Sequence, residues 1–235
     1  MMIKSKPLHP FFFWWGALFV SVFLKARFNK IKVKEIDIKP GHSYILMCNH
    51  FSFLDGFLAY YLSNRLFRKK NGMRKLYIMS VKKQMEKIWW LRYIGSFSIE
   101  PGKRSIDESF TYAAEVLSEP GNLLLFYPQA KLESNHIRHI HFEDGLNQII
   151  PQIKGNCQLV WSSNIIEYFE STKPSLYYNL LDCGTNGDYD FERLKQKVNL
   201  HHRAAIEENF RFTEEPTIIR HPMSIANRIV SSDDE

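Results

Sequence analysis

A histidine and an aspartate stand close together where an apolar stretch of the chain ends. The segment ILMCNHFSFLDGFLAYY, residues 45–61, places Asn49 and His50 after its apolar part, and Asp55 follows. A carboxylate bonded to one ring nitrogen of a histidine fixes the tautomer and leaves the other nitrogen free to take a proton. The sequence therefore offers His50 as a general base and Asp55 as its orienting acid. The nucleophile would be a hydroxyl of the substrate.

Two other interpretations of this segment stay open. Ser52 and Asp55 have the spacing of a capping box, in which the acid only closes the first turn of a helix. Cys48 stands two residues before His50, so the two could form a Cys–His nucleophile pair. The alternative for Cys48 is a small buried residue of the core.

The elements that must position these residues are short apolar runs alternating with helical patterns. Strands are predicted at 31–38, 43–48, 77–81, 96–100, 122–127, 157–162 and 175–181, and helices at 52–62, 82–94, 105–118, 143–153 and 189–209. This alternation predicts an α/β fold with a mixed central sheet flanked by helices. A strand that ends at 48 would deliver His50 to the sheet edge, where α/β proteins usually bind ligands.

The N-terminal segment is strongly apolar. Residues 11–24 read FFFWWGALFVSVFL, which is shorter than the ~20 apolar residues of a full membrane span. Lys4 and Lys6 precede it as in a signal peptide, but the apolar run continues directly into Lys25 and Arg27 without a small-residue cleavage site. We expect an uncleaved helix that lies in one leaflet of a membrane. The alternative is a buried helix of a soluble protein.

Composition narrows the class of protein. The chain has 31 basic and 25 acidic residues, a net charge of +6, and only three cysteines, which is too few for a disulfide framework. The basic excess suits anionic membranes, nucleic acid or phosphorylated substrates, but the sequence contains no recognised nucleic-acid-binding motif. His136, His139 and His141, with His201 and His202, lack the cysteine or carboxylate pattern of a zinc site. We therefore expect no metal and no nucleic-acid partner.

Four segments in order carry a family resemblance. They are the N-H-x4-D pattern at 49–55, GSFSIEPGKR at 95–104, FYPQAK at 126–131 and FEDGL at 142–146. Together they resemble the motifs of the glycerolipid acyltransferases, the lysophosphatidic acid acyltransferase-like family, over roughly residues 30–165. The resemblance implies an acyltransferase domain at 31–225, behind a membrane-anchoring helix with its basic flank at 1–30 and before a frayed acidic tail at 226–235.

The resemblance also implies a reaction. A fatty acyl group would pass from acyl-CoA or acyl carrier protein, as co-substrate, to a hydroxyl of a lysophospholipid or related lipid, with His50 as the base and Asp55 orienting it. No other cofactor is implied, and the enzyme would work on the cytoplasmic face of a membrane. The residues implied in substrate binding are Asn49, Lys103, Arg104, Tyr127, Pro128, Gln129 and Lys131.

The chain departs from the family pattern near the acceptor site. Gln129 replaces a glutamate, Ala130 replaces a glycine, and Pro101 stands where an arginine is expected. These changes fit a non-glycerolipid acceptor such as an aminolipid, a glycolipid or a lipid pigment. They also leave open a catalytically silent relative that binds acyl carriers or lipids, although such a protein has no reason to keep both His50 and Asp55.

Overall fold

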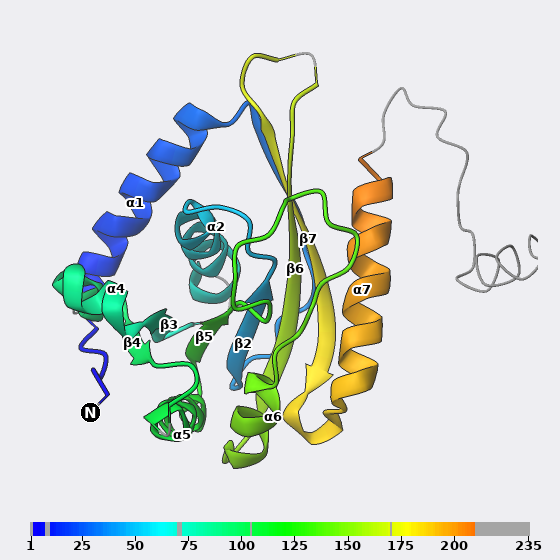
Figure 1. The fold of residues 1–235 in the computed structure, drawn as a ribbon. Helices are drawn as coiled ribbons and strands as arrows, with labels where there is room; N and C mark the ends of the chain where they lie inside the picture. Colours follow the sequence, from blue (N-terminus) through cyan, green and yellow to red (C-terminus); the bar gives the residue numbers. More distant parts are fainter. Residues whose placement is uncertain (1, 8–9, 70–71, 104, 170, 210–235) are drawn as a thin grey trace, which may run out of the picture.

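The protein is built on one seven-stranded sheet with the strand order β1-β7-β6-β2-β5-β3-β4. The computed structural model describes residues 2–7, 10–69, 72–103, 105–169 and 171–209 (Figure 1). The strands are β1 (Lys30–Lys34), β2 (Ser43–Cys48), β3 (Lys75–Val81), β4 (Ser96–Ile99), β5 (Asn122–Phe126), β6 (Cys157–Glu167) and β7 (Ser175–Thr185).

Strand direction decides where the candidate residues meet. The five strands β6, β2, β5, β3 and β4 run parallel to one another. Strand β7 is antiparallel to β6, and β1 is parallel to β7. The carboxyl ends of five strands therefore share one edge, and the predicted mixed α/β sheet is confirmed.

Helices cover both faces of this sheet. They are α1 (Pro10–Arg27), α2 (Asp55–Leu62), the π-helix η1 (Ser63–Arg68), α4 (Lys82–Lys87), α5 (Ser105–Leu117), α6 (Gly145–Ile149) and α7 (Phe191–Glu207), with 3-10 turns η2 (Trp89–Ile94), η3 (Ile150–Gln152) and η4 (Asn186–Asp188). Side chains of β2 alternate between two cores. Ile45 and Met47 pack with α5, α6 and α7, whereas Tyr44 and Leu46 pack with α1 and α2.

Helix α1 packs on α2, the helix that begins at the candidate site. The Tyr60 hydroxyl of α2 donates a hydrogen bond of 2.8 Å to the carbonyl oxygen of Phe13. The centroids of the Phe13 and Tyr60 rings lie 4.5 Å apart, with an angle of 31° between the ring planes. Gly16 permits this approach, because a Cβ there would lie 2.9 Å from the Tyr60 hydroxyl oxygen. No helix in the described part of the chain is long and apolar enough to cross a membrane.

The predicted helices differ from the structure at their ends, most clearly those at 82–94 and 52–62. The helix predicted at 82–94 ends at Lys87, where Ile88 leaves the helical conformation, and the chain continues as the 3-10 turn η2 up to Gly95. Gly95 has φ 101°, a left-handed conformation that ends the turn and favours glycine. The helix predicted from Ser52 begins instead at Asp55, because residues 51–54 form the turn that holds the candidate site.

Candidate active site

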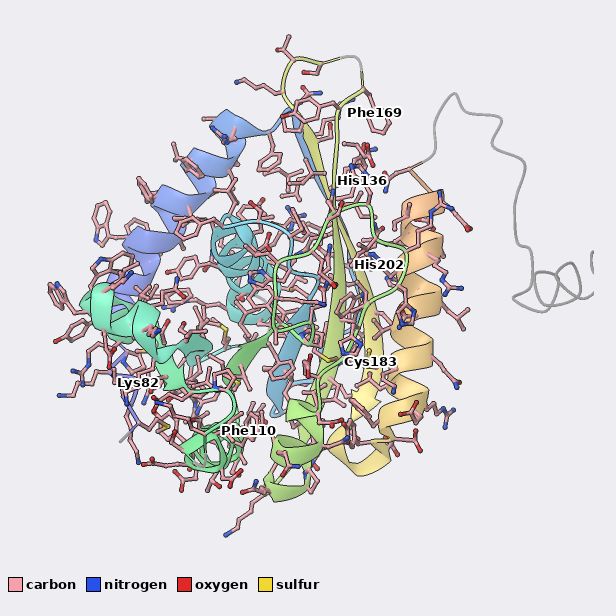
Figure 2. The ribbon with its side chains drawn as sticks, in the orientation of Figure 1. Lys82, Phe110, His136, Phe169, Cys183 and His202 are labelled. Atoms are coloured by element: carbon pink, nitrogen blue, oxygen red, sulfur yellow. The ribbon has the colours of Figure 1, made fainter. Side chains whose placement is uncertain are left out.

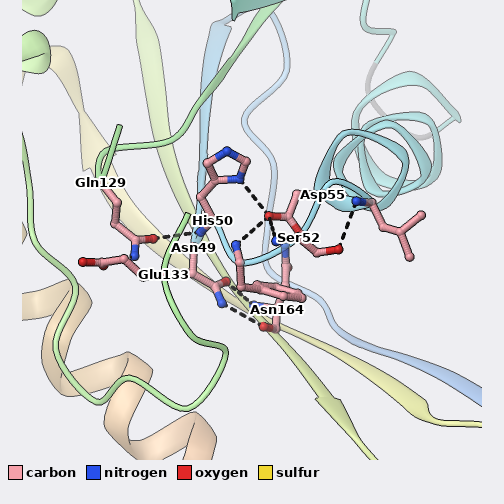
Figure 3. Close-up of polar contacts among 9 residues, drawn as sticks. Asn49, His50, Ser52, Asp55, Gln129, Glu133 and Asn164 are labelled. Carbon is pink, nitrogen blue, oxygen red and sulfur yellow. Dashed lines mark hydrogen bonds and ion pairs between the residues drawn. The ribbon is translucent and has the colours of Figure 1, made fainter. Parts of the chain in front are cut away.

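His50 and Asp55 meet at the carboxyl end of β2. Nδ1 of His50 lies 2.8 Å from Oδ2 of Asp55 (Figure 3). A carboxylate can only accept, so Nδ1 carries the proton and Nε2 is the basic nitrogen of the neutral ring. No described residue forms a hydrogen bond with Nε2, and 28% of the His50 side chain is exposed. The predicted base and its orienting acid are therefore in contact.

One oxygen of Asp55 contacts both the imidazole and the turn that carries it. Besides His50, Oδ2 accepts hydrogen bonds from the backbone N–H groups of Phe51 at 2.7 Å and Ser52 at 2.9 Å. The predicted capping box is not formed, because α2 begins at Asp55 with Leu54 as its N-cap; the bond from Ser52 instead closes the turn before the helix, where the Ser52 hydroxyl also accepts from the N–H of Leu54 at 3.1 Å. Asp55 is thus a turn-closing residue and an orienting acid at once.

The carboxylate of Asp55 is almost completely removed from water, with 1% of the residue exposed. Its second oxygen, Oδ1, is buried and has no hydrogen-bond partner among the described residues. A buried acceptor without a partner costs free energy, so it is uncommon outside functional sites. The three bonds to Oδ2 hold the group in place despite this cost.

An aromatic ring fixes the plane of the imidazole. Tyr127, one residue beyond β5, stacks on His50 with ring centroids 4.3 Å apart and an interplanar angle of 25°. Burial raises the pKa of the Tyr127 hydroxyl well above its usual value, so this group does not act as a base. Its face can stabilise the positive charge that forms on His50 when the ring takes a proton.

Asn49 ties the end of β2 to the neighbouring strand β6. Its side-chain amide donates to the carbonyl oxygen of Asn164 at 2.9 Å and accepts from the N–H of Asn164 at 2.7 Å. Asn49 is 2% exposed, so this pair of bonds is shielded from water. The residue next to the base is thereby fixed to the sheet.

Gln129 and Glu133 hold His50 from the other side. The side-chain oxygen of Gln129 accepts from the backbone N–H of His50 at 2.8 Å, and its amide nitrogen donates to the Glu133 carboxylate. The N–H of Glu133 in turn donates to the carbonyl oxygen of His50 at 2.9 Å. Both ends of the Gln129 amide are therefore used within the protein, and its side chain is buried.

The turn between these two residues is unusual for its sequence. Ala130 has φ 53°, in the left-handed region that glycine adopts without strain. Lys131 follows and places its ammonium group 3.3 Å from Glu133. Hydrogen bonding to Gln129, and then the proximity of Lys131, lowers the pKa of Glu133. Pro128 is held by its carbonyl oxygen, which accepts from the N–H of Glu143 at 2.9 Å.

A second charged group lies at the end of β4, three strands from β2 in the sheet order. Glu100 contacts Lys82 at 3.0 Å and Lys103 at 3.1 Å. These hydrogen bonds, that of Lys82 first, lower the pKa of Glu100 to about 2. Lys103 is thus already paired with an acid, and Arg104 lies outside the described residues. The tail predicted at 226–235 lies outside them too.

The structure does not favour the alternative sites raised by the sequence. Burial raises the pKa of the Cys48 thiol, and Cys48 is fully buried in the core between the sheet and α2, so it is not placed to act as a nucleophile. Within the described ranges, no group of three or more His, Cys, Asp or Glu side chains could hold a metal ion. His202 is a buried core residue whose ring contacts Ser163 and Ile137.

Several contacts of the site had no signal in the sequence. Glu133 reaches Gln129 only because the chain reverses at Ala130, and Asn164 is brought to Asn49 by strand pairing. The backbone N–H groups of residues 50–52, just before α2, are not available to bind an oxyanion. The structure commits them to Gln129 and Asp55 instead.

Comparisons with known proteins show the family and a similar fold. Residues 30–162, more than half of the chain, match the model of the family described as Acyltransferase. No curated protein matches the chain significantly. Among solved structures, the fold is similar to that of the 1-acyl-sn-glycerophosphate (LPA) acyltransferase PlsC from Thermotoga maritima. That likeness has a TM-score of 0.55 and 15% identity, over 84% of this chain and 80% of that one. The chain belongs to the Acyltransferase family.

Proposed function

We propose that this acyltransferase moves a fatty acyl group from a thioester to a hydroxyl of a lipid acceptor. The donor would be acyl-CoA or acyl carrier protein, and the acceptor a lysophospholipid or a related lipid. The observation that carries the proposal is the 2.8 Å contact between His50 Nδ1 and Asp55 Oδ2, which leaves Nε2 without a hydrogen bond from any residue that the structure describes. This is the arrangement that general base catalysis requires.

The reaction would proceed without a nucleophile from the protein. Nε2 of His50 takes the proton of the acceptor hydroxyl as its oxygen attacks the thioester carbonyl. The carbon–sulfur bond then breaks, an oxygen ester forms, and the proton passes from Nε2 to the leaving thiolate. Asp55 keeps the ring oriented and stabilises the imidazolium while it carries the proton. The Tyr127 ring supports the same charge from its face.

The acceptor head group would lie near the second charged group. Lys103 and Lys131, with Asn49, Tyr127, Pro128 and Gln129, remain our candidates for substrate contacts or for positioning them. Lys103 and Lys131 are each paired with an acid, Glu100 and Glu133. Paired cations attract a terminal phosphate less than free ones. This pairing favours the second candidate acceptor class, the hydroxyl of an aminolipid, glycolipid or lipid pigment.

We place the enzyme on the cytoplasmic face of a membrane, docked through α1. Three apolar side chains of this helix, Leu18, Phe19 and Val22, are exposed on its outer face, and the opposite face packs on the domain. Exposed contiguous apolar surface marks interaction sites. A lipid acceptor would reach His50 from the bilayer, and the thioester donors are made in the cytosol.

The test is the release of thiol from palmitoyl-CoA by the purified protein, with lipid extract in detergent as the source of acceptors. We expect the parent and the His139→Ala variant, which changes an exposed histidine, to release thiol only when lipid is present. His50→Ala should remain folded and release none. Binding of palmitoyl-CoA without acceptor-dependent release by the parent would favour the silent, binding-only relative.

A further inference from the structure

Four of the five tryptophans of the chain point into solvent. Trp14 and Trp15 lie on α1 and Trp89 and Trp90 on η2, and each is between 49% and 68% exposed. Trp161, by contrast, is completely buried in the core. Tryptophan is rarely so exposed in soluble proteins, and its amphipathic ring favours the membrane–water interface. The two exposed pairs therefore have the chemistry of a shared contact surface.

The N-terminal segment brings the two pairs close together. The N–H of Lys6, just before α1, donates to the carbonyl oxygen of Arg92 in η2 at 2.9 Å. Ile3 exchanges two hydrogen bonds with Ser98 of β4, from its N–H at 2.8 Å and to its carbonyl oxygen at 2.9 Å. The start of α1 is therefore fixed next to η2, as the ribbon also shows (Figure 1).

The side chains of η2 contribute little to the buried core of the protein. The sequence of η2 is WWLRYI, yet none of these six residues is buried, and Trp89, Trp90 and Ile94 are exposed. The chain leaves the helical conformation at Ile88, directly before these residues. Apolar side chains gathered on a surface in this way mark a site of interaction.

We propose that η2 is a second membrane-contacting element, which forms one docking surface with the outer face of α1. This inference rests on the proposed docking of α1 and extends it to a segment that the sequence places in the middle of the catalytic domain. The apolar members of the surface are Trp14, Trp15, Leu18, Phe19, Val22, Trp89, Trp90 and Ile94.

Charge selects an anionic bilayer as the occupant. Exposed basic side chains flank the apolar surface before α1, at the end of α1 and on α4, namely Lys4, Lys6, Lys25, Arg27, Lys83 and Lys87. Basic residues near an anionic membrane surface add electrostatic attraction to the apolar contact. A second copy of this chain would bring the same positive charge and be repelled.

Two docking elements would also set the orientation of the enzyme. A single helix on a membrane can roll about its axis, whereas contacts from α1 and η2 together fix the tilt of the domain. Because α1 packs on α2, and α2 begins at Asp55, the docking surface and the candidate base belong to one packed layer. The distance of His50 from the lipid surface would then be constant.

Intrinsic fluorescence distinguishes the two elements. In the Trp14→Phe/Trp15→Phe variant, the remaining exposed emission comes from Trp89 and Trp90. We expect it to be quenched by phosphatidylglycerol vesicles with brominated acyl chains. A variant with all four replaced by Phe reports the buried Trp161 alone and sets the baseline. Unquenched emission from η2, with quenching retained in Trp89→Phe/Trp90→Phe, would overturn the inference and leave α1 as the docking element.

Affinity gives a second, independent readout. Trp89→Ser/Trp90→Ser should weaken partitioning onto these vesicles by roughly tenfold or more, because each ring loses its burial in the bilayer. The matched control is Leu200→Ser, since Leu200 is as exposed as Trp89, at 68%, but lies on α7 at the other end of the sheet. Equal affinity of the tryptophan variant and the parent would contradict the inference.

The other partners have distinct outcomes. A dimer in solution that the tryptophan variant abolishes, or binding of acyl carrier protein through the same residues in preference to vesicles, would overturn the lipid assignment. If the parent protein does not bind vesicles at all, the proposed membrane docking fails with this inference. Thiol release in detergent would still test acyl transfer separately.

Discussion

Among single residues, Asp55 holds the candidate site together through one carboxylate oxygen. Oδ2 of Asp55 accepts from the imidazole of His50 and from the two backbone N–H groups of the turn that carries it. The turn cannot move without moving the base. The contact between His50 and Asp55 is local, so the spacing in the sequence was sufficient to predict that the two side chains meet.

Asp55→Asn tests the orienting role. An amide offers one acceptor oxygen for the turn and presents an NH₂ group to Nδ1, which would move the ring proton to Nε2 and remove the base. We expect kcat to fall by about 10²- to 10⁴-fold, the typical contribution of general base catalysis. Thiol release measures kcat, and a thermal unfolding curve checks that the variant is folded. Asp107→Asn on the exposed face of α5 is the control, and parent-like turnover by Asp55→Asn would refute the role.

Ala130→Gly tests the strain in the turn that follows Gln129. An alanine in the left-handed conformation costs about 1–2 kcal/mol. Glycine removes this cost, but it loses more conformational entropy on folding, which offsets part of the gain in stability. At φ 53° we therefore expect the variant to be more stable by about 0.5–1 kcal/mol, with unchanged turnover. Urea unfolding measures the difference. A loss of stability would show that the Ala130 methyl group makes a contact that outweighs the strain.

At the scale of the element, the structure shows what local patterns could and could not predict. The apolar runs at 43–48 and 122–127 became β2 and β5, and the pattern at 105–118 became α5. The helix predicted at 82–94 is broken at Ile88, and Trp89 and Trp90 lie exposed where a helix pattern would place core residues. The hydrophobic periodicity of the sequence cannot predict whether these tryptophans are buried or exposed, because their exposure depends on what covers the surface.

The segment between β5 and α6 shows the same limit. It has no regular structure, and α7 holds it through residues far away in the sequence. Asn199 makes two hydrogen bonds to the backbone of Ile140, and His202 makes one to the carbonyl oxygen of Ile137. The sequence predicted α7 but no contact for it, because side-chain capture of a distant loop leaves no periodic signal.

The pH dependence of stability tests the contact of His202. Burial lowers the pKa of His202 from 6.5 to about 4, so the unfolded chain binds a proton that the folded protein excludes between these values. Stability from this group is complete above pH 6.5 and is lost as the pH falls toward 4. The loss is up to about 3 kcal/mol, from about 1.4 kcal/mol per pKa unit.

The measurement is the free energy of unfolding in urea between neutral and mildly acidic pH. We expect the parent to lose more stability over this range than His202→Asn, in which the group cannot titrate. His139→Asn, at an exposed position, should follow the parent. Parallel curves for the parent and His202→Asn would show that His202 does not titrate as its burial requires.

In the molecule as a whole, the candidate site and the exposed apolar surface lie at different places on the sheet. The carboxyl edge of β2 and β5 carries His50 and its supports, and α1 with η2 presents apolar surface at the end of the molecule where β4 lies (Figure 1). Side chains between these regions fill two continuous cores, one on each face of the sheet (Figure 2). The fold class followed from the alternation of strands and helices, but the order of the strands could not be predicted from one sequence.

The net charge of +6 gives a prediction for the whole protein. We expect it to sediment with phosphatidylglycerol vesicles at low ionic strength, and to release progressively as salt shortens the Debye length from about 10 Å at 0.1 M to about 3 Å at 1 M. Phosphatidylcholine vesicles, which carry no net charge, should bind less protein at low salt. Binding that is equal for both lipids and independent of salt would show that apolar contacts alone drive docking.

The most direct test of the central claim is a comparison of total lipid extracts from one host that expresses the parent, His50→Ala or His139→Ala. We expect a lipid species with one additional acyl group in the parent and His139→Ala extracts only, and its mass would identify the acceptor class. The same species at the same level with His50→Ala, from protein shown to be folded, would contradict the assignment of His50 as the catalytic base.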